Sequence, residues 1–325
     1  MQRSVIRIIG RNPGLRFATS GLQKKNIMHI VMTGATGFIG SQLCAFLRAQ
    51  GYDISALVRD SARARKILGR SVMLFERWHD APLHADAVIN LAGAPIVGKR
   101  WSAKNKDQMR ASRLSVTQGM VAWLPRMHVQ PEVIVNASAV GFYGYHGDEE
   151  LNESSAAGAD FGAQLCRDWE QVALQAEALN IRVCRMRFGV VLSPAGGALA
   201  RMLPAFKFGM GGPLGDGQQW FSWVHLQDLM NALVLVLNAH EQRGAFNVTA
   251  PNPVRNGDFT DALAQVLHRP AVMRMPAWAL HLLMGEGADI LLRGQRVLPQ
   301  RLLDAGFQFQ YPTLASALAE LGSKS

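Results

Sequence analysis

The sequence predicts an α/β protein in which a doubly wound, mainly parallel sheet precedes a smaller C-terminal lobe. Three observations support this prediction. Short apolar runs alternate with helical patterns over the first 190 residues, a glycine-rich turn follows the first run, and the chain becomes loop-rich after about residue 191. Alternating strands and helices are typical of βαβ units, which build parallel sheets covered by helices on both faces.

Six apolar runs are expected to form the strands of this sheet. The first, His29–Thr33, directly precedes the glycine-rich turn, and the others leave room for a connection after each strand. Such short, continuous apolar runs are typical of strands that are buried on both faces. The other five strands are predicted at residues 54–58, 72–75, 87–91, 133–135 and 181–186.

The helices are predicted from apolar residues at helical spacing and from their end signals. The first begins at Phe38 and stops before Gly51, and a polar segment from Ser102 to Leu124 reads as a long helix capped by Ser102. Further helices are expected at 168–179, 226–237 and 257–267. We assign 28–190, with returning segments near 220–250, to a Rossmann-type domain. Residues 191–322 form the substrate lobe and include a C-terminal domain at 276–322.

The glycine-rich turn predicts a dinucleotide-binding loop. Gly34, Gly37 and Gly40 follow a strand and open a helix, which is the context that this chemistry requires. Glycines allow close approach of a pyrophosphate, and the helix N-terminus offers it free N–H groups and a positive dipole. The expected cofactor contacts are Gly34, Thr36, Gly37, Phe38, Ile39 and Gly40, joined by Asn90, Ala92 and Gly93 after the fourth strand.

The end of the second strand favours NADP(H) as the dinucleotide. An acid at this position would bind the ribose 2′-hydroxyl of NAD, whereas an arginine suits the 2′-phosphate of NADP. Arg59 occupies it and Arg63 follows, although Asp60 is adjacent and leaves both interpretations open.

Composition limits the remaining partners. The chain has a net charge of +10, but its first 28 residues carry six basic residues and no acid, so the rest carries only +4. That charge is too small to suggest a nucleic-acid footprint, and no apolar run is long enough to span a membrane.

The three cysteines have no paired spacing, which favours a reducing compartment and argues against a metal site. We therefore expect a small-molecule substrate and no nucleic acid, membrane or metal partner. The sequence is compatible with a homodimer.

Residues 1–27 form a basic N-terminal extension with three interpretations. They read as an organellar transit peptide, as a disordered basic arm, or as sequence upstream of a true start at Met28. The expected location is the cytoplasm, or a mitochondrion or other organelle if the extension is a transit peptide.

Several phrases together resemble the extended short-chain dehydrogenase/reductases, the nucleotide-sugar epimerase-like proteins. They include the glycine loop, residues 90–93, Ser138 before Tyr143-Gly144, and the phrase 223–228. Residues 99–101, 187–192 and 203–213 narrow the resemblance to an atypical branch that includes YfcH-type epimerase family proteins. It covers about residues 28–322. Members that perform redox chemistry use a Tyr-x-x-x-Lys pair as proton donor and ribose ligand, with a serine that polarises the substrate oxygen.

This chain departs from that pattern. Four positions after its four tyrosines stand Ala56, Gly147, Glu149 and Ala315, so the pair is absent, and its slots near residues 161–166 hold no phenol or ammonium. Ser138 matches the catalytic serine. Tyr143 and Lys99, each after a strand at the carboxyl edge, are the candidate replacements. Equally, Tyr143 reads as a packing residue and Lys99 as a solvated one. Two functions therefore compete: an NADP(H)-dependent oxidoreductase or epimerase with rearranged acid/base groups, and a catalytically silent NADP(H) sensor.

Overall fold

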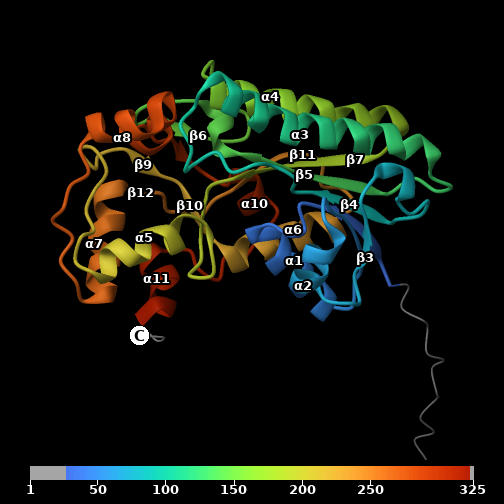
Figure 1. The fold of residues 1–325 in the computed structure, drawn as a ribbon, viewed down its shortest axis with the longest axis horizontal. Helices are drawn as coiled ribbons and strands as arrows, with labels where there is room; N and C mark the ends of the chain where they lie inside the picture. Colours follow the sequence, from blue (N-terminus) through green and yellow to red (C-terminus); the bar gives the residue numbers. More distant parts are fainter. Residues whose placement is uncertain (1–26, 323–325) are drawn as a thin grey trace, which may run out of the picture.

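Seven parallel strands form one central sheet, in the order β11-β7-β5-β4-β1-β2-β3 (Figure 1). The computed structural model describes residues 27–322, so the predicted N-terminal extension lies outside the described residues except at Ile27. The sheet confirms the predicted fold class. Its strands are β1 (His29–Thr33), β2 (Asp53–Leu57), β3 (Met73–Phe75), β4 (Ala87–Asn90), β5 (Val133–Ala139), β7 (Arg182–Phe188) and β11 (Gly244–Val248).

Helices cover both faces of this sheet. In Figure 1, α3 (Ala103–Trp123) and α4 (Phe161–Leu174) lie above it, and α1 (Phe38–Ala49), α2 (Ser61–Leu68) and α6 (Leu226–Asn238) lie below. Successive side chains of β1 point alternately into the hydrophobic cores on the two faces of the sheet. Ile30 and Met32 join the core on the α1 and α6 side, while Val31 joins the core that contains Trp123 of α3. Burial on both faces explains why the strands read as continuous apolar runs.

The order of the strands reverses at β1, and this reversal positions the site. The chain passes from β1 to β2 and β3, then crosses back to β4 on the other side of β1. Thr33 and Asn90 are paired at the carboxyl ends of β1 and β4. Ligands of open parallel sheets bind in the crevice at such a switch point. The glycine-rich turn, which follows Thr33, therefore lies where the topology places a ligand.

Among the strands of the central sheet and the helices that cover it, three elements differ from the sequence-based expectations. The seventh strand, β11, and helix α2 had no predicted counterpart. Helix α4 begins at Phe161 rather than at residue 168, because the carboxylate of Asp160 caps it by accepting a hydrogen bond from the Ala163 N–H (3.1 Å). The cores on the two faces of the sheet include residues of the predicted strands, and the core on the α1 side also includes Phe246 and Val248 of β11.

A second lobe lies at the left of Figure 1. It contains α5 (Gly197–Lys207), α7 (Asn256–Leu267) and α11 (Leu314–Gly322), which pack around Phe206, Phe259 and Leu263. Short two-stranded sheets connect it to the main body. They pair β8 (Val190–Leu192) with β10 (Trp223–His225), and β9 (Trp220–Phe221) with β12 (Val254–Arg255).

The C-terminal residues return to the edge of the main sheet. They form α8 (Ala277–Met284), α9 (Asp289–Leu292), β13 (Arg296–Val297) and α10 (Gln300–Asp304), and β13 pairs with β6 (Glu150–Leu151). The Ser222 hydroxyl donates to the carbonyl of Gln295 (2.6 Å) and accepts from the N–H of Val297 (3.0 Å). The C-terminal segment is thus fixed by hydrogen bonds to the loop between β9 and β10.

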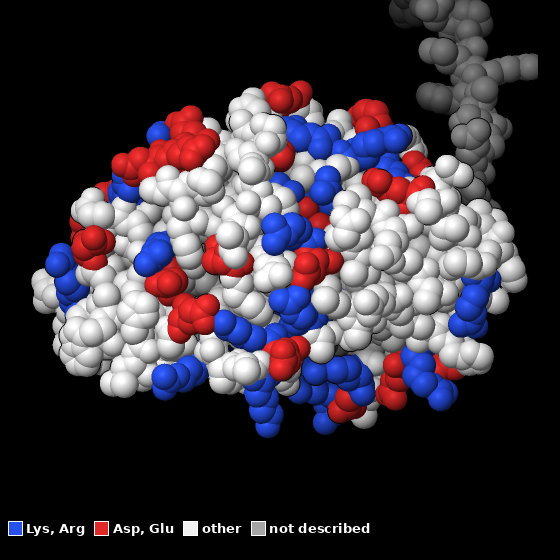
Figure 2. Space-filling model, turned by 90° about the horizontal axis from the view of Figure 1, so that it is seen from above, with Lys and Arg blue, Asp and Glu red and all other residues white. Residues whose placement is uncertain are grey.

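The surface above the sheet carries mixed charge. Figure 2 shows basic and acidic side chains interspersed over this face rather than gathered in one basic stripe. Within residues 27–322, none of the helices has the length and apolar character needed to cross a bilayer.

Candidate functional site

Two of the three loop glycines are required by packing inside the protein. Gly34 has a φ of +70°, and a Cβ on it would lie 2.5 Å from the carbonyl oxygen of Leu91. A Cβ on Gly40 would lie 2.2 Å from the carbonyl oxygen of Gly34. Both contacts are far inside van der Waals distance, so the strand, loop and helix meet only because these side chains are absent.

Gly37 faces outward and is open. It is exposed, and a Cβ there would approach only the Gly34 carbonyl oxygen, at 3.2 Å. It is the N-cap of α1, no side chain caps that end, and no acid lies in the first turn. The amides of the first turn therefore remain available to an anion, which fits a dinucleotide pyrophosphate. Thr36 is exposed beside it, whereas the side chain of Ile39 packs on the core, so only its backbone faces the loop.

The second lobe touches this loop through Phe38. A Cβ on Gly196 would lie 2.3 Å from the ring of Phe38, and one on Gly197 would lie 2.8 Å from it. The glycine pair lets the backbone before α5 lie flat against the aromatic ring. The predicted contact residue Phe38 therefore also joins the two lobes at the cofactor loop.

The acid at the end of β2 has a structural role. The Asp60 carboxylate accepts a 2.9 Å hydrogen bond from the Arg63 N–H and is the N-cap of α2. Arg59 and Arg63 are exposed, and among residues 27–322 neither has a carboxylate within ion-pair distance. Asp60 therefore serves its own helix through Oδ1, while the two guanidinium groups are exposed to solvent.

The side chain of Asn90 is engaged inside the protein, so a cofactor contact by this residue stays a prediction for its backbone alone. It is fully buried, and its Oδ1 accepts from the hydroxyl of Thr33 (2.5 Å). Its Nδ2 donates to Thr117 Oγ1 (2.8 Å) and to Asn136 Oδ1 (2.6 Å). The amide is satisfied within the protein, so it ties β1, β4, β5 and α3 together.

Ala92 and Gly93 continue from β4 along the carboxyl edge. The Ala92 N–H donates to the hydroxyl of Thr33 (3.2 Å), which fixes the segment beside the glycine loop. Gly93 is exposed, and a Cβ on it would lie 2.9 Å from Cζ of Arg113, a buried residue of α3. The missing side chain of Gly93 therefore makes room for this guanidinium, a relationship that the sequence did not reveal.

Ser138 lies near the carboxyl end of β5, as predicted. It is 4% exposed, and its buried Oγ adjoins the thiol of Cys166 but has no nitrogen or oxygen hydrogen-bond partner among the described residues. The neighbouring thiol of Cys166 has a pKa raised to about 11, chiefly by burial. The thiol therefore stays protonated at neutral pH, and the Ser138 hydroxyl remains an unused polar group beside the predicted cleft.

Tyr143 belongs to the core, and its assignment as a substrate contact is wrong. It is fully buried; its hydroxyl donates to Asn247 Oδ1 (2.6 Å) and accepts from Arg187 Nη1 (2.9 Å). Burial raises the pKa of the phenol above its ordinary value, although the Arg187 guanidinium opposes the shift. A general acid/base needs access and a lowered pKa, and Tyr143 has neither.

Tyr145 is the half-buried phenol that the sequence analysis did not single out. Burial raises its pKa, and the nearby carboxylates of Asp160 and Asp289 raise it further, against the weaker effect of Arg293. The Tyr145 hydroxyl therefore stays protonated near neutral pH, and it can donate a hydrogen bond. Neither phenol on this segment has the lowered pKa that the Tyr/Lys chemistry requires.

Apolar side chains fill the helical turn where the Tyr/Lys pair was expected. Leu165 is buried and joins a cluster with Trp101 and Met109, against which Phe161 packs. The rings of Trp101 and Phe161 meet edge to face at 5.0 Å. Lys106 lies over Phe161, with its Nζ 5.0 Å from the ring centre, and forms an ion pair with Glu286 at 2.5 Å. This part of α4 is a packing surface for the loop after β4.

Lys99 and Arg100 lie on that same loop and are exposed. The loop is held from both sides. Arg201 of α5 donates to the carbonyl of Val97 (3.2 Å), and the N–H of Trp101 donates to the carbonyl of Met284 (3.1 Å). The described contacts include no ion pair for Lys99. A catalytic cation at Lys99 remains a prediction.

The phrase at residues 223–228 has a structural role. His225 Nδ1 accepts from the Gln227 N–H (3.2 Å) at the start of α6. The Asp228 carboxylate accepts from the N–H groups of Gln310 (2.8 Å) and Tyr311 (2.9 Å). These contacts hold the C-terminal segment against α6.

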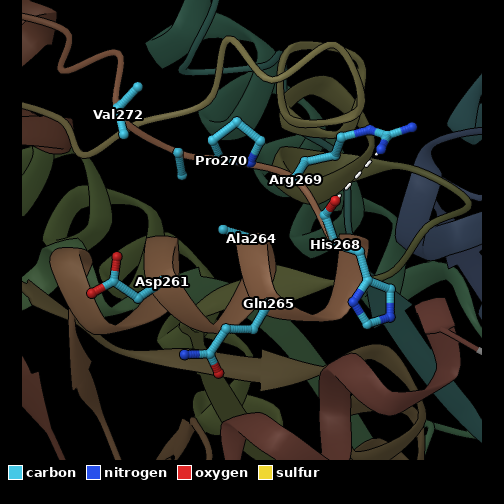
Figure 3. A pocket seen from close by; sticks show the side chains of 8 residues that line it. Asp261, Ala264, Gln265, His268, Arg269, Pro270 and Val272 are labelled. Atoms are coloured by element: carbon cyan, nitrogen blue, oxygen red, sulfur yellow. Dashed lines mark hydrogen bonds between the residues drawn. The ribbon is translucent and has the colours of Figure 1, made fainter.

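Two surface clefts lie away from the glycine loop. One, of about 660 Å³, follows the end of α7, where Asp261, Gln265 and Arg269 border it (Figure 3). The other, of about 600 Å³, borders β11 between Glu153, Arg185 and Arg301. Neither contains the switch point of the sheet. We place the candidate site by topology and by the open groups at the ends of β1, β4 and β5.

Two family models match the chain. Residues 30–249 match the NAD dependent epimerase/dehydratase family, and residues 275–321 match a domain of unknown function (DUF1731). The epimerase family protein SDR39U1 homolog, chloroplastic, of Arabidopsis thaliana is 42% identical over 304 residues, covering 91% of this chain and 87% of that protein. The epimerase family protein ML0860 of Mycobacterium leprae is 38% identical over 291 residues, covering 89% of this chain and 94% of that protein.

Solved structures agree with this assignment. The human epimerase family protein SDR39U1 (isoform 2), crystallised with NADPH, aligns with a TM-score of 0.83 and 31% identity, over 92% of this chain and 100% of that one. A nucleoside-diphosphate sugar epimerase of Corynebacterium glutamicum aligns with a TM-score of 0.73 and 30% identity, over 91% of this chain and 59% of that one. The chain belongs to the NAD dependent epimerase/dehydratase family.

Proposed function

We propose that the protein binds NADP(H) on the loop at residues 34–40 and presents the dinucleotide to a small molecule. The observation that carries this proposal is that the acid and the two arginines after β2 have different roles. Asp60 caps α2, whereas Arg59 and Arg63 are exposed cations. A free acid would favour NAD, and two free guanidinium groups favour the 2′-phosphate of NADP. The human relative crystallised with NADPH supports the same choice.

The residues of this chain divide the remaining tasks. The open face of Gly37 and the amides of the first turn of α1 receive the pyrophosphate, and Arg59 with Arg63 hold the 2′-phosphate. A bound nicotinamide would supply hydride chemistry. Ser138 is the hydroxyl placed to donate a hydrogen bond to a substrate oxygen, because its Oγ has no nitrogen or oxygen partner among the described residues and adjoins only the thiol of Cys166. No phenolate is formed, since the pKa values of Tyr143 and Tyr145 are both raised.

A catalytically silent NADP(H) sensor is the second candidate. The apolar cluster of Trp101, Phe161 and Leu165 favours it, because it occupies the helical turn that would carry the acid/base pair. In this function, NADP(H) orders the loops around the switch point. A partner then binds these loops only in the ordered conformation. The two candidates share the cofactor site and differ only in whether a substrate is converted.

A metabolite screen at saturating NADPH separates the two candidates. Thermal unfolding would be followed first, because a ligand that binds the native state raises the melting temperature. Compounds that shift it would then be incubated with NADPH while its oxidation is monitored. Turnover that is lost in Ser138→Ala, with NADPH affinity retained, supports the enzyme. A stabilising ligand that is never converted supports the sensor.

A cytoplasmic location and a homodimer stay predictions. One relative is named as chloroplastic, so location differs within the family or depends on N-terminal segments. Fractionation of the tagged full chain and light scattering of the purified protein test these two predictions.

A further inference from the structure

Arg113 is a buried cation that lacks an anionic partner in the described part of the chain. It lies on α3 and is 8% exposed. Its Nη1 donates to the carbonyl of Met109 (3.1 Å) and its Nη2 to the carbonyl of Ala94 (3.1 Å). The guanidinium also lies over Trp169, with Cζ 5.2 Å from the ring centre. Carbonyl and ring contacts orient this charge, but they do not neutralise it.

Two other buried arginines show how the fold usually compensates such a charge. Arg187 forms a bidentate pair with Glu170, through contacts of 2.8 and 2.9 Å. Arg182 donates to the carbonyl of Val236 near the end of α6 (2.8 Å) and has Glu132 at 4.0 Å. Arg113 has no such carboxylate between residues 27 and 322. A buried unpaired charge is costly, and its retention indicates a partner that arrives from outside.

The guanidinium is accessible from one direction, through Gly93. A Cβ on Gly93 would lie 2.9 Å from Cζ and 3.2 Å from Nε of Arg113, so any side chain would collide with this group and cover it. Gly93 is exposed and follows β4 at the carboxyl edge of the sheet. The opening over Arg113 therefore faces the edge where the switch point places a ligand.

A second unsatisfied group belongs to the same region. Ser138 lies near the carboxyl end of β5, the neighbour of β4, and its buried Oγ has no nitrogen or oxygen hydrogen-bond partner among the described residues, only the weakly bonding thiol of Cys166. Cys166 of α4 connects the two, because its thiol adjoins Ser138 and lies within electrostatic range of Arg113. A cation without a carboxylate partner and a hydroxyl whose polar neighbour is a protonated thiol thus lie on either side of Cys166.

We propose that Arg113 and Ser138 together receive an oxyanion, a carboxylate or phosphate oxygen, from the ligand bound at the carboxyl edge of β4 and β5. The inference rests on the proposed NADP(H) function and names the chemical class of the ligand. Arg113 then supplies, from α3, the cation that the missing lysine would have supplied from α4. The oxyanion belongs either to the dinucleotide or to a separate small molecule held next to it.

Calorimetric titrations of the full chain distinguish these sources. NADPH is titrated into the wild type, Arg113→Met, Arg113→Lys and the control Arg110→Met. Arg110 lies one turn earlier on α3 but is paired with Asp168 on the surface. Acetate and inorganic phosphate are then titrated in the presence of saturating NADPH at constant ionic strength, with acetamide as the neutral isostere of acetate. Thermal unfolding of every variant without ligand reports whether it folds.

If the oxyanion belongs to a small molecule, wild type and Arg110→Met bind acetate or phosphate and ignore acetamide. Arg113→Met then loses at least tenfold in anion affinity, Arg113→Lys loses less, and NADPH affinity is unchanged. If the oxyanion belongs to the dinucleotide, Arg113→Met loses at least tenfold in NADPH affinity instead. Arg113→Met should fold and melt a few degrees below the wild type, because it loses hydrogen bonds to two carbonyls but no ion pair.

The proposal is overturned if wild type binds NADPH, Arg113→Met binds it equally, and neither anion binds the wild type more tightly than acetamide does. It is also overturned if Arg113→Lys unfolds in the absence of ligand, because the charge would then be structural. A wild type that fails to bind NADPH at all refutes the proposed function, which is a separate result.

Discussion

The hydroxyl of Tyr143 donates a 2.6 Å hydrogen bond to Oδ1 of Asn247, across the sheet edge between the segment after β5 and strand β11. The same hydroxyl accepts from Arg187, which is itself held by Glu170. This chain of contacts joins four segments that are distant in sequence. The tyrosine that the sequence offered as a replacement for the catalytic phenol is therefore part of the framework.

Replacing Tyr143 with phenylalanine should destabilise the protein without changing its site. The change leaves a buried acceptor on Asn247 and a buried donor on Arg187 unsatisfied, at a cost of about 1–3 kcal/mol in unfolding free energy. Denaturant unfolding measures this loss, and NADPH affinity should stay within twofold of the wild type. Tyr145→Phe is the control for loss of a phenol nearer the surface. Normal stability together with lost turnover in Tyr143→Phe would contradict our interpretation.

The loop glycines should separate into packing and binding positions. Gly40→Ala places a Cβ 2.2 Å from the Gly34 carbonyl oxygen, so we expect a stability loss of about 1–3 kcal/mol. Gly37→Ala places its Cβ on the exposed side of the loop, 3.2 Å from the Gly34 carbonyl oxygen, and should fold with a small loss of stability, yet weaken NADPH binding by more than about tenfold by crowding the pyrophosphate. Melting temperatures and titrations of the two variants test this. If Gly37→Ala binds NADPH as tightly as the wild type does, the pyrophosphate does not bind beside Gly37.

Arg59 should determine the choice between the two dinucleotides. Arg59→Ala removes one charge from the 2′-phosphate and should weaken NADPH by about tenfold, or about 1.4 kcal/mol, while leaving NADH unaffected. Asp60→Ala is the matched control. It should cost about 1 kcal/mol of stability through loss of the α2 cap and leave the NADPH to NADH ratio unchanged. An Asp60→Ala variant that loses NADH affinity would show that the acid contacts the ribose after all.

Glu153 should give stability a pH dependence of known sign. Burial raises its pKa in the folded state, although the N–H groups of Asn247 and Arg301 oppose the shift. A raised folded pKa means that its stabilising contribution is present below the unfolded pKa and is lost as pH rises through the folded value. Glu153→Gln keeps the acceptor for both amides and removes the titration. Its melting temperature should therefore fall less than that of the wild type between about pH 4 and pH 7.

The exposed Glu177, on a turn after α4, provides the control for this measurement. Glu177→Gln should reproduce the wild-type pH dependence. A Glu153→Gln profile that runs parallel to the wild type would show that the Glu153 carboxylate does not differ in proton affinity between the folded and unfolded states.

The fold was predictable where local pattern and chain topology agree. The run at His29–Thr33 is buried on both faces, so its apolar character identifies it directly, and the glycines after it mark the turn. The first half of α4 was missed because its apolar residues Phe161 and Leu165 pack against Trp101, a contact that the local pattern does not show. The sequence indicated that segments near 220–250 return to the Rossmann domain, but it did not identify the run at Gly244–Val248 as a strand, which pairs with β7 at the edge of the sheet.

The sequence predicts the position of the backbone loop of the site better than it predicts the roles of the side chains around it. The spacing of Gly34, Gly37 and Gly40 is itself a backbone requirement, so the sequence identifies the loop. The role of Asn90 depends on Thr33, Thr117 and Asn136, three partners that only the fold brings within hydrogen-bond distance. Arg113 looked like one more basic residue on a polar helix. Its significance lies in burial beneath Gly93, which is a tertiary property.

Direct titration of NADPH and NADH into the full chain tests the central claim, that the loop at residues 34–40 and Arg59 form an NADP(H) site. The account predicts that NADPH binds at least about tenfold more tightly than NADH, a difference of about 1.4 kcal/mol in binding free energy. It predicts as well that this preference disappears in Arg59→Ala. Equal affinity for the two dinucleotides, or no heat of binding from either at millimolar concentration, would contradict it.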